Sequence, residues 1–270
     1  RSRTLGSEQN TTYQVPLADI DNDGDLDIIV GNDRIENQVF KNDGNGNFTF
    51  DHYFGVKESN TRGLCIADLN QDGFVDIVVA NRKSQNYIYF NNSKGYFSKG
   101  KPFGNRDEAT INIASADLNQ DGHIDLVLAN RNSQPNKIYF GPNFEQSFLF
   151  GENNNETRGI AIEDMNQDGF LDIIAVNIGD KNRIYFGNGS GKFARSIFFG
   201  KTSDATMAVI IGDLDNDGDL DIVAGNNNQK NQYFINNGDE FAAFQFGESS
   251  SISYGVTLGD FSGNGKLDII

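Results

Sequence analysis

The hydrophobic positions of this chain fall in short runs that recur at nearly regular intervals, each just after an acidic stretch. The runs comprise residues 28–30, 77–79, 126–128, 173–174 and 222–223. Consecutive apolar residues without alternation are typical of a strand that is covered on both faces. The pattern therefore predicts a series of buried strands, one in each copy of a long repeat.

Other strands are predicted on both sides of each buried run. The segment before the acidic stretch ends in a small residue in all copies but one, which has Glu163. After the buried run come an aromatic third segment, as in residues 87–90, 138–140 and 184–186, and a fourth that closes on Phe-Gly. Four short strands per period of about 40–50 residues predict an all-β fold, a β-propeller of four-stranded antiparallel blades. No segment has a sustained helical period, so we expect almost no helix.

Six repeats are visible, and no stretch of different composition interrupts them. We therefore expect a single β-propeller domain over residues 1–270. The sixth repeat stops inside a predicted second strand, so we expect a fragment that ends inside the last blade of an intact ring of six or seven blades.

The acidic stretch that precedes each buried run is the strongest chemical signal. Its copies start at Asp19, Asp68, Asp117, Asp164, Asp213 and Asp260, and subtraction of these numbers gives intervals of 49, 49, 47, 49 and 47 residues. Side-chain oxygens fall at positions one, three, five and nine around a Gly at position six. Hard oxygen donors around a sharp turn, without His or Cys, favour Ca²⁺.

We therefore expect five or six Ca²⁺ ions, each with four side-chain ligands and the backbone carbonyl of the variable position seven. In position order, the predicted ligands are Asp19, Asp21, Asp23, Asp25 and Asp27; Asp68, Asn70, Asp72, Phe74 and Asp76; Asp117, Asn119, Asp121, His123 and Asp125; Asp164, Asn166, Asp168, Phe170 and Asp172; Asp213, Asp215, Asp217, Asp219 and Asp221; and Asp260, Ser262, Asn264, Lys266 and Asp268. The sixth set has fewer carboxylates, which predicts weaker binding and leaves its occupancy open.

Two other interpretations compete for these loops. In the first interpretation, the loops are Asx turns that join strands and need no metal. The near-complete acidic motif in five repeats argues against this interpretation. An EF-hand needs Glu at position twelve between helices, whereas position twelve here is Val30, Val79, Leu128, Ala175 or Ala224.

Composition narrows the possible partners. The formal net charge is −16, which disfavours nucleic acid as a partner because phosphate binding needs a basic face. Six Ca²⁺ ions would add 6 × 2 = 12 charges and leave about −4. Cys65 is the only cysteine, so the chain has no internal disulfide. No apolar run approaches the length of a membrane span.

The Asp-x-[Asp/Asn]-x-Asp-Gly-x-x-Asp loop, the Phe-Gly closure and the period together resemble the FG-GAP/VCBS repeats, the calcium-binding blades of integrin α-subunit propellers and of many bacterial and fungal extracellular proteins. The resemblance covers essentially the whole chain. It implies calcium ligation by the residues named above and a secreted or cell-surface location. The Gly-Ala-Pro element of integrin blades is replaced by Thr-Arg-Gly at residues 61–63 and 157–159, which favours the broader VCBS-type group.

For function, we expect an extracellular calcium-binding propeller that recognises or adheres to a glycan or an extracellular protein, with lectin-like or cell-adhesion character. No catalytic constellation emerges, so we expect no enzyme activity. Two alternatives stay open, a structural component of a cell-surface or filamentous assembly and the propeller of a polysaccharide lyase. Fold alone does not decide among them.

Two smaller sets of residues are candidates for other contacts. Arg62, Arg158, Arg82 and Arg131 lie near predicted strand ends, where arginine suits carbohydrate or protein ligands. Asn-x-Ser/Thr sequons make Asn10, Asn47, Asn91, Asn155 and Asn188 candidates for N-glycosylation.

Overall fold

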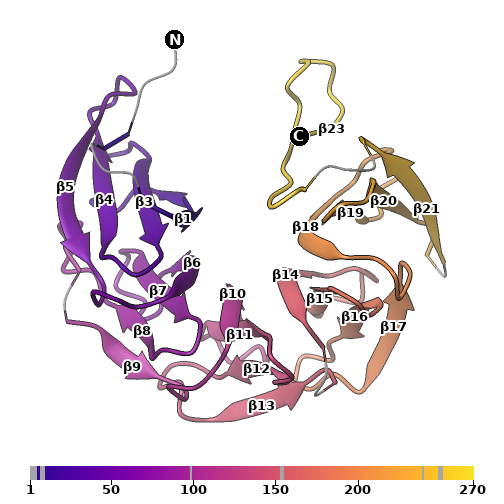
Figure 1. Ribbon diagram of the computed structural model, residues 1–270, viewed down its shortest axis with the longest axis horizontal. Helices are drawn as coiled ribbons and strands as arrows, with labels where there is room; N and C mark the ends of the chain where they lie inside the picture. Colours follow the sequence, from indigo (N-terminus) through magenta and orange to yellow (C-terminus); the bar gives the residue numbers. More distant parts are fainter. Residues whose placement is uncertain (1–4, 7–9, 98, 153–154, 239, 249–251) are drawn as a thin grey trace. The chain divides into compact units, whose positions relative to one another are not determined.

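The computed structural model of the chain describes residues 5–6, 10–97, 99–152, 155–238, 240–248 and 252–270 (Figure 1). The described residues form strands, turns and bends and contain no helix. This confirms the predicted all-β fold of repeated four-stranded antiparallel blades.

The first sheet has the order β1-β3-β4-β5, with β2 also paired to β3. Its strands are β1 (Thr12–Gln14), β2 (Leu17–Ala18), β3 (Asp27–Asn32), β4 (Asn37–Asn42) and β5 (Phe48–Phe54). Pro16 separates β1 from β2, and its carbonyl still accepts a hydrogen bond from Ile29 N at 3.1 Å. Because proline has no amide proton to donate, this innermost strand is broken in two, and the sheet is a four-stranded blade with an interrupted first strand.

Four more sheets repeat the plan with an unbroken first strand, each in sequence order. The second comprises β6 (Thr61–Ala67), β7 (Asp76–Asn81), β8 (Asn86–Tyr89) and β9 (Lys101–Phe103), and the third β10 (Thr110–Ala116), β11 (Asp125–Asn130), β12 (Asn136–Tyr139) and β13 (Ser147–Phe150). The fourth comprises β14 (Thr157–Glu163), β15 (Asp172–Asn177), β16 (Asn182–Phe186) and β17 (Arg195–Phe199), and the fifth β18 (Thr206–Gly212), β19 (Asp221–Asn226), β20 (Asn231–Asn236) and β21 (Phe241–Phe246). In the sixth repeat β22 (Leu258–Gly259) pairs with β23 (Asp268–Ile269).

Contacts group the chain into two compact units. The first contains Arg1–Ser115, His123–Leu128 and Ile138–Ser147, and the second contains Ala116–Gly122, Ala129–Lys137 and Phe148–Ile270. Within the first unit, the sheets β1–β5 and β6–β9 share a core that includes Ile29, Val39, Leu64, Ile77 and Val79. The second strand of each sheet is buried on both faces, as the unbroken apolar runs predict.

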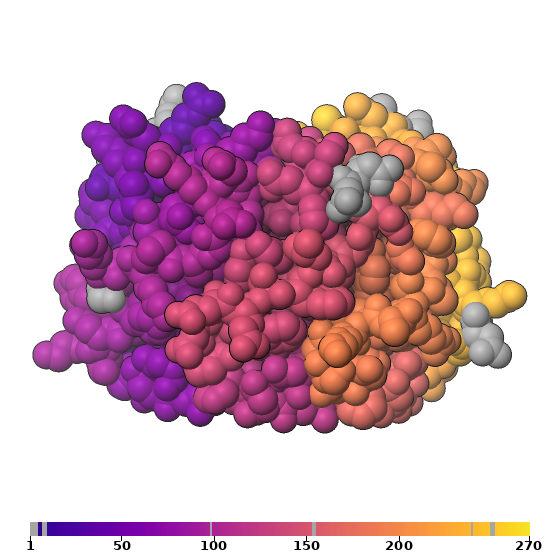
Figure 2. All heavy atoms as spheres, turned by 90° about the horizontal axis from the view of Figure 1, so that it is seen from below, coloured from indigo at the N-terminus to yellow at the C-terminus, as the bar shows by residue number. Residues whose placement is uncertain are grey.

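The second unit has an equivalent core between β14–β17 and β18–β21. Ile174, Val176 and Ile184 pack there against Ile222, Ala224 and Phe234. In the space-filling view the atoms of these two repeats lie against one another without a gap (Figure 2). In both units, one blade thus buries its apolar face against the next, which is the reason such repeats are not stable singly.

Candidate functional site: the acidic loops

The six acidic stretches are loops that lead from the first strand of each repeat into the second. They are named loops 1 to 6 and comprise residues 19–27, 68–76, 117–125, 164–172, 213–221 and 260–268. Position six is Gly in a left-handed conformation, with φ of +95° at Gly24 and +87° at Gly73. A Cβ added at either would meet nothing within 4 Å. The backbone angle, rather than a lack of space, therefore selects glycine.

The Asp at position one closes the turn from inside. In every loop its carboxylate accepts a hydrogen bond from the amide of the position-six glycine, at 2.8–3.1 Å. In loops 1 to 4 and in loop 6 it also accepts from the backbone amide of position five. This is an Asx-type turn, as the alternative interpretation requires. It is compatible with a cation because a carboxylate has about four acceptor sites.

In loops 1 to 5 the Asp at position nine is buried and attaches the loop to the sheet. Asp76 accepts from Leu69 N at 3.1 Å with one oxygen and from Asn91 N at 2.9 Å with the other. Asp172 and Asp221 make the corresponding pairs of bonds. Burial raises the pKa of Asp76 and of Asp172 to about 6, because the charged carboxylate loses water. Burial likewise raises the pKa of Asp27 and of Asp221.

Carboxylates converge most closely in loops 1 and 5. Among the described residues, oxygen atoms of Asp19, Asp21 and Asp27 lie within 4.8 Å of one another, and so do those of Asp213, Asp215 and Asp221. Position three is Asn in loops 2, 3 and 4, where its side-chain amide donates to the position-five carboxylate at 3.0 Å. The structure therefore brings three acidic groups together where position three is Asp.

The donor set fits a hard cation. All side-chain donors in loops 1, 2, 4 and 5 are carboxylate or amide oxygens, which is the set that Ca²⁺ prefers. Within the described part of the chain, the buried Oδ1 of Asp21 accepts no hydrogen bond. A buried acceptor without a donor is costly, and a cation would satisfy it.

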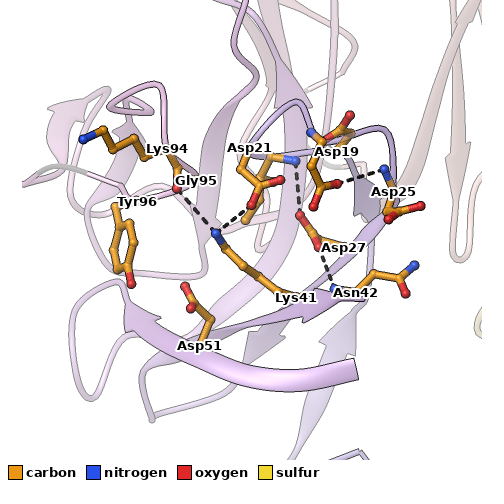
Figure 3. A network of polar contacts seen from close by, with 12 residues as sticks. Asp19, Asp21, Asp25, Asp27, Lys41, Asn42, Asp51, Lys94, Gly95 and Tyr96 are labelled. Atoms are coloured by element: carbon orange, nitrogen blue, oxygen red, sulfur yellow. Dashed lines mark hydrogen bonds and ion pairs between the residues drawn. The ribbon is translucent and has the colours of Figure 1, made fainter. Parts of the chain in front are cut away.

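A basic side chain from β4, which the sequence analysis did not single out, lies against loop 1. Lys41 Nζ lies 2.7 Å from Asp21 Oδ2 (Figure 3). Burial alone would lower the pKa of Lys41, but the hydrogen bond and charge of Asp21 outweigh it, and the pKa lies above its usual value. Loop 1 is therefore electrostatically unlike loop 5, although three carboxylates converge in each.

Loop 6 is built differently. Asp260 keeps the bond from Gly265 N at 2.8 Å. Asp268 at position nine is only half-buried, and one of its oxygens accepts from Ser262 N at position three instead of from position two. This weaker attachment is consistent with the lower affinity expected for this loop.

Adjacent loops are joined by the residue at position four, which the sequence analysis did not single out. Asn22 Nδ2 donates to the carbonyl of Gly73 at 3.1 Å, Gln120 Nε2 to that of Gly169 at 3.2 Å, and Gln167 Nε2 to that of Gly218 at 2.9 Å. The sequence did contain a feature that could have indicated this contact, because position four has an amide side chain in five repeats.

A second missed network joins the strands of neighbouring blades. Asn136 Nδ2 donates to Thr157 Oγ1, which donates to Asn177 Oδ1. The backbone N–H of Asn177 donates to Asn182 Oδ1, and Asn182 Nδ2 donates to Thr206 Oγ1. All five side chains are buried. The Asn at position fourteen, present in five repeats, was the signal for this network.

Arg62 and Arg131, two of the candidate arginines, form ion pairs within the chain. Arg62 Nη1 lies 2.9 Å from Asp33 Oδ1, and its guanidinium stacks 4.0 Å from the centroid of the Tyr13 ring. Arg131 Nε lies 2.8 Å from Glu156 Oε2. Arg62 and Arg158 both lie at a β-bulge, where the register shifts between the flanking Thr and Gly. Arg82 forms an isolated bridge with Ala109.

The five sequon asparagines differ in exposure. Asn188 is exposed, and Asn10 and Asn47 are half-buried. Asn91 and Asn155 are buried, and Asn91 Nδ2 donates to the carbonyls of Ile20 and Val75 at 2.8 and 3.0 Å. A glycan on Asn91 would require both bonds to break.

These blades and loops define a β-propeller with a repeated acidic loop, and family comparison gives the class a name. The family model of the FG-GAP-like repeat matches residues 19–79, 68–128, 117–175, 164–224 and 213–270, so the chain belongs to this family. No curated protein matches the sequence.

Solved structures with a similar fold are distant in sequence. One is BBS1N in complex with ARL6DN, soaked with lead, with 10% identity, a TM-score of 0.52, and coverage of 95% of this chain and 86% of that one. The mercury-soaked form of that complex gives 13% identity, a TM-score of 0.59 and coverage of 87% and 69%. The Dos1 propeller gives 10% identity and a TM-score of 0.64, and the match covers 88% of this chain and 59% of that one. At these identities the likeness supports the propeller fold alone.

No helix among the described residues has both the length and the apolar character needed to cross a membrane.

Proposed function

We propose that this FG-GAP-like propeller binds Ca²⁺ in its acidic loops as structural ions and serves as an extracellular module that recognises or adheres to a ligand. The observation that carries the proposal is the convergence of Asp213, Asp215 and Asp221 within 4.8 Å around a left-handed glycine turn. Three carboxylates at this spacing repel one another, and a divalent ion offsets the repulsion.

The position-nine carboxylates support a coupling between calcium and stability. Asp76 and Asp172 are buried, and an ionised buried carboxylate is disfavoured without a positive partner. A bound ion supplies that partner and joins the first two strands of a blade through the loop. Calcium should therefore stabilise the folded state by mass action.

A protein ligand is the partner that the comparisons support best. The similar propeller BBS1N was solved in complex with another protein, ARL6DN. The arginines at the bulges of this chain, Arg62 and Arg158, could contribute to such a surface, since bulges redirect side chains at sheet edges. An extracellular glycan ligand, the absence of catalysis and a secreted or cell-surface location are further parts of the proposal.

Calorimetric titration with Ca²⁺ tests the metal-binding part. We expect five or six sites per chain, with Mg²⁺ binding more weakly. Asp217→Ala and Asp72→Ala should each remove one site, because each takes away the position-five oxygen of one loop. Heat of dilution alone at millimolar Ca²⁺ would refute the metal proposal.

Binding to immobilised extracellular proteins and to a glycan array, with and without a calcium chelator, tests recognition. Saturable binding that chelation abolishes, without change to the ligand, is the expected result. Depolymerisation of a polysaccharide on the array would instead identify an enzyme.

A further inference from the structure

Lys41 is a charged residue at a position that is apolar in the other repeats. It is the fifth residue of β4, and the register pairs its neighbour Phe40 with Ile28. In the fifth repeat the corresponding pair is Phe234 with Ile222, so Ile235 occupies the place of Lys41. The hydrogen bonds of the next residue support this correspondence between Lys41 and Ile235. Asn42 N donates to Asp27 Oδ1 and Asn236 N donates to Asp221 Oδ1, both at 2.8 Å. By sequence alignment, the other repeats have Phe90, Phe140 and Phe186 there.

The ammonium group of Lys41 points into the carboxylate cluster of loop 1. Nζ is 2.7 Å from Asp21 Oδ2 and 3.5 Å from the carbonyl oxygen of Lys94 in the next blade (Figure 3). The ring of Tyr96 has its centroid 5.7 Å from Nζ. Only 25% of the Lys41 side chain and 19% of the Asp21 side chain are exposed. The ammonium is therefore held by groups from two blades and is largely shielded from water.

Loop 5 provides the internal comparison. Its three convergent carboxylates have the same chain positions as those of loop 1, but Asp215 is exposed where Asp21 is shielded. Asp215 and Ile235 line one pocket together with Leu214. A side chain at position 235 thus lies near the position-three carboxylate, as Lys41 lies near Asp21.

A fixed ammonium has two opposite effects on such a cluster. Without metal, the ammonium neutralises one of the negative charges and so reduces the repulsion among the carboxylates. Shielding from water strengthens the attraction between the ammonium and its carboxylate partner. When Ca²⁺ is present it competes for the same carboxylate and repels the divalent ion. Fewer free negative ligands lower calcium affinity.

We propose that Lys41 is a built-in counter-ion of loop 1, which makes this loop a weaker calcium site than loop 5 and keeps the first repeat folded when calcium is scarce. This inference rests on the proposed calcium binding by the loops. It assigns to Lys41 a difference in calcium affinity between two loops that have Asp at the same five positions of the sequence.

The reciprocal variants Lys41→Ile and Ile235→Lys test it in the full chain. Lys41→Ile should strengthen calcium binding at one site by about tenfold or more, through the loss of the competing charge. It should also lower the melting temperature in calcium-free buffer, because Asp21 loses its partner. Ile235→Lys should do the reverse, weakening one site and raising the calcium-free melting temperature.

Adding Asp23→Ala to Lys41→Ile assigns the strengthened site to loop 1, since the gain should then disappear. An unchanged calcium isotherm in both reciprocal variants, with the remaining sites still filling, would overturn the role of Lys41 but leave the calcium proposal intact. If no variant and no wild-type protein binds calcium, the proposed function fails instead. If Lys41→Ile does not fold, Ile235→Lys still decides the question.

Discussion

Gln167 donates from its side-chain amide to the carbonyl oxygen of Gly218, 51 residues further along the chain, at 2.9 Å. The same amide lies 2.8 Å from Asp219 Oδ1. Gln167 occupies the left-handed position four of loop 4, and Gly218 is the turn glycine of loop 5. One loop therefore restrains the shape of the next, and the geometry of two candidate metal sites is linked through a single side chain.

Removal of this link should affect both loops. Gln167→Ala should lower the free energy of unfolding by about 1 kcal/mol, the usual contribution of an intramolecular hydrogen bond. It should also weaken calcium binding at loop 4 and at loop 5 together, because the carbonyl of Gly218 loses its donor. Urea denaturation and calcium titration measure the two effects.

The exposed Gln146 is the matched control, since its backbone carbonyl and not its side chain accepts from Phe140 N. Gln146→Ala should leave both quantities unchanged. A Gln167→Ala protein that binds calcium as the wild type does would show that the loops are independent.

The buried Asn–Thr network predicts a larger loss of stability. Asn182 receives a bond from Asn177 N at 2.9 Å and donates to Thr206 Oγ1 at 3.0 Å. Asn182→Ala leaves buried polar groups without partners, so we expect a loss of about 2–3 kcal/mol in the free energy of unfolding. Asn143→Ala, at an exposed position, should change it by less than about 0.5 kcal/mol. Equal effects of the two substitutions in urea denaturation would contradict a structural role for the network.

The raised pKa values of Asp76 and Asp172 predict an unusual pH dependence for the calcium-free protein. Burial raises the pKa of both groups in the folded state to about 6, against an ordinary aspartate pKa of 3.8, so the folded state binds protons more readily than the unfolded state. The stabilising contribution of protonation is complete below pH 3.8 and is lost as the pH rises through 6. The calcium-free protein should therefore melt at a higher temperature at pH 5 than at pH 7.

Calcium reverses this dependence, because the ligands must be ionised to bind the metal. The increase in melting temperature that calcium produces should shrink from pH 7 to pH 5. Thermal melts at pH 5 and pH 7, each with and without calcium, give the four melting temperatures that test this prediction. A calcium-free protein that loses stability between pH 7 and pH 5 would be incompatible with these two carboxylates as buried acids.

Expression in a secretory eukaryotic host tests the sequons one by one. The exposed Asn188 should be glycosylated, whereas Asn91 should stay unmodified because its amide makes two buried hydrogen bonds. Peptide mass spectrometry gives the occupancy of each. A glycan on Asn91 in folded protein would mean that this turn opens far more than its contacts suggest.

Much of the fold follows from local sequence. Unbroken apolar runs identify the second strand of each blade, and the Phe-Gly closures and acidic loops mark the remaining boundaries. Pro16 also acts locally, because it breaks the first strand of one blade. The acidic loops could be located to the residue for the same reason, since each is formed by nine consecutive residues.

The contacts between repeats were harder to predict. The bond from Lys41 to Asp21 spans 20 residues, and the bond from Gln167 to Gly218 spans 51. Each depends on the strand register or on how successive blades pack. Comparison of the repeats flags both residues, Lys41 as an exception among apolar residues and Gln167 as a recurring amide, but only coordinates show what they contact.

Anomalous diffraction from crystals grown with calcium is the most direct test of the central claim that the acidic loops hold divalent ions. We predict a calcium peak between the carboxylates of Asp213, Asp215 and Asp221 in loop 5 and comparable peaks in loops 2 and 4. A weaker peak is expected in loop 1, next to Lys41. Loops without any anomalous peak in saturating calcium would show that they do not hold divalent ions.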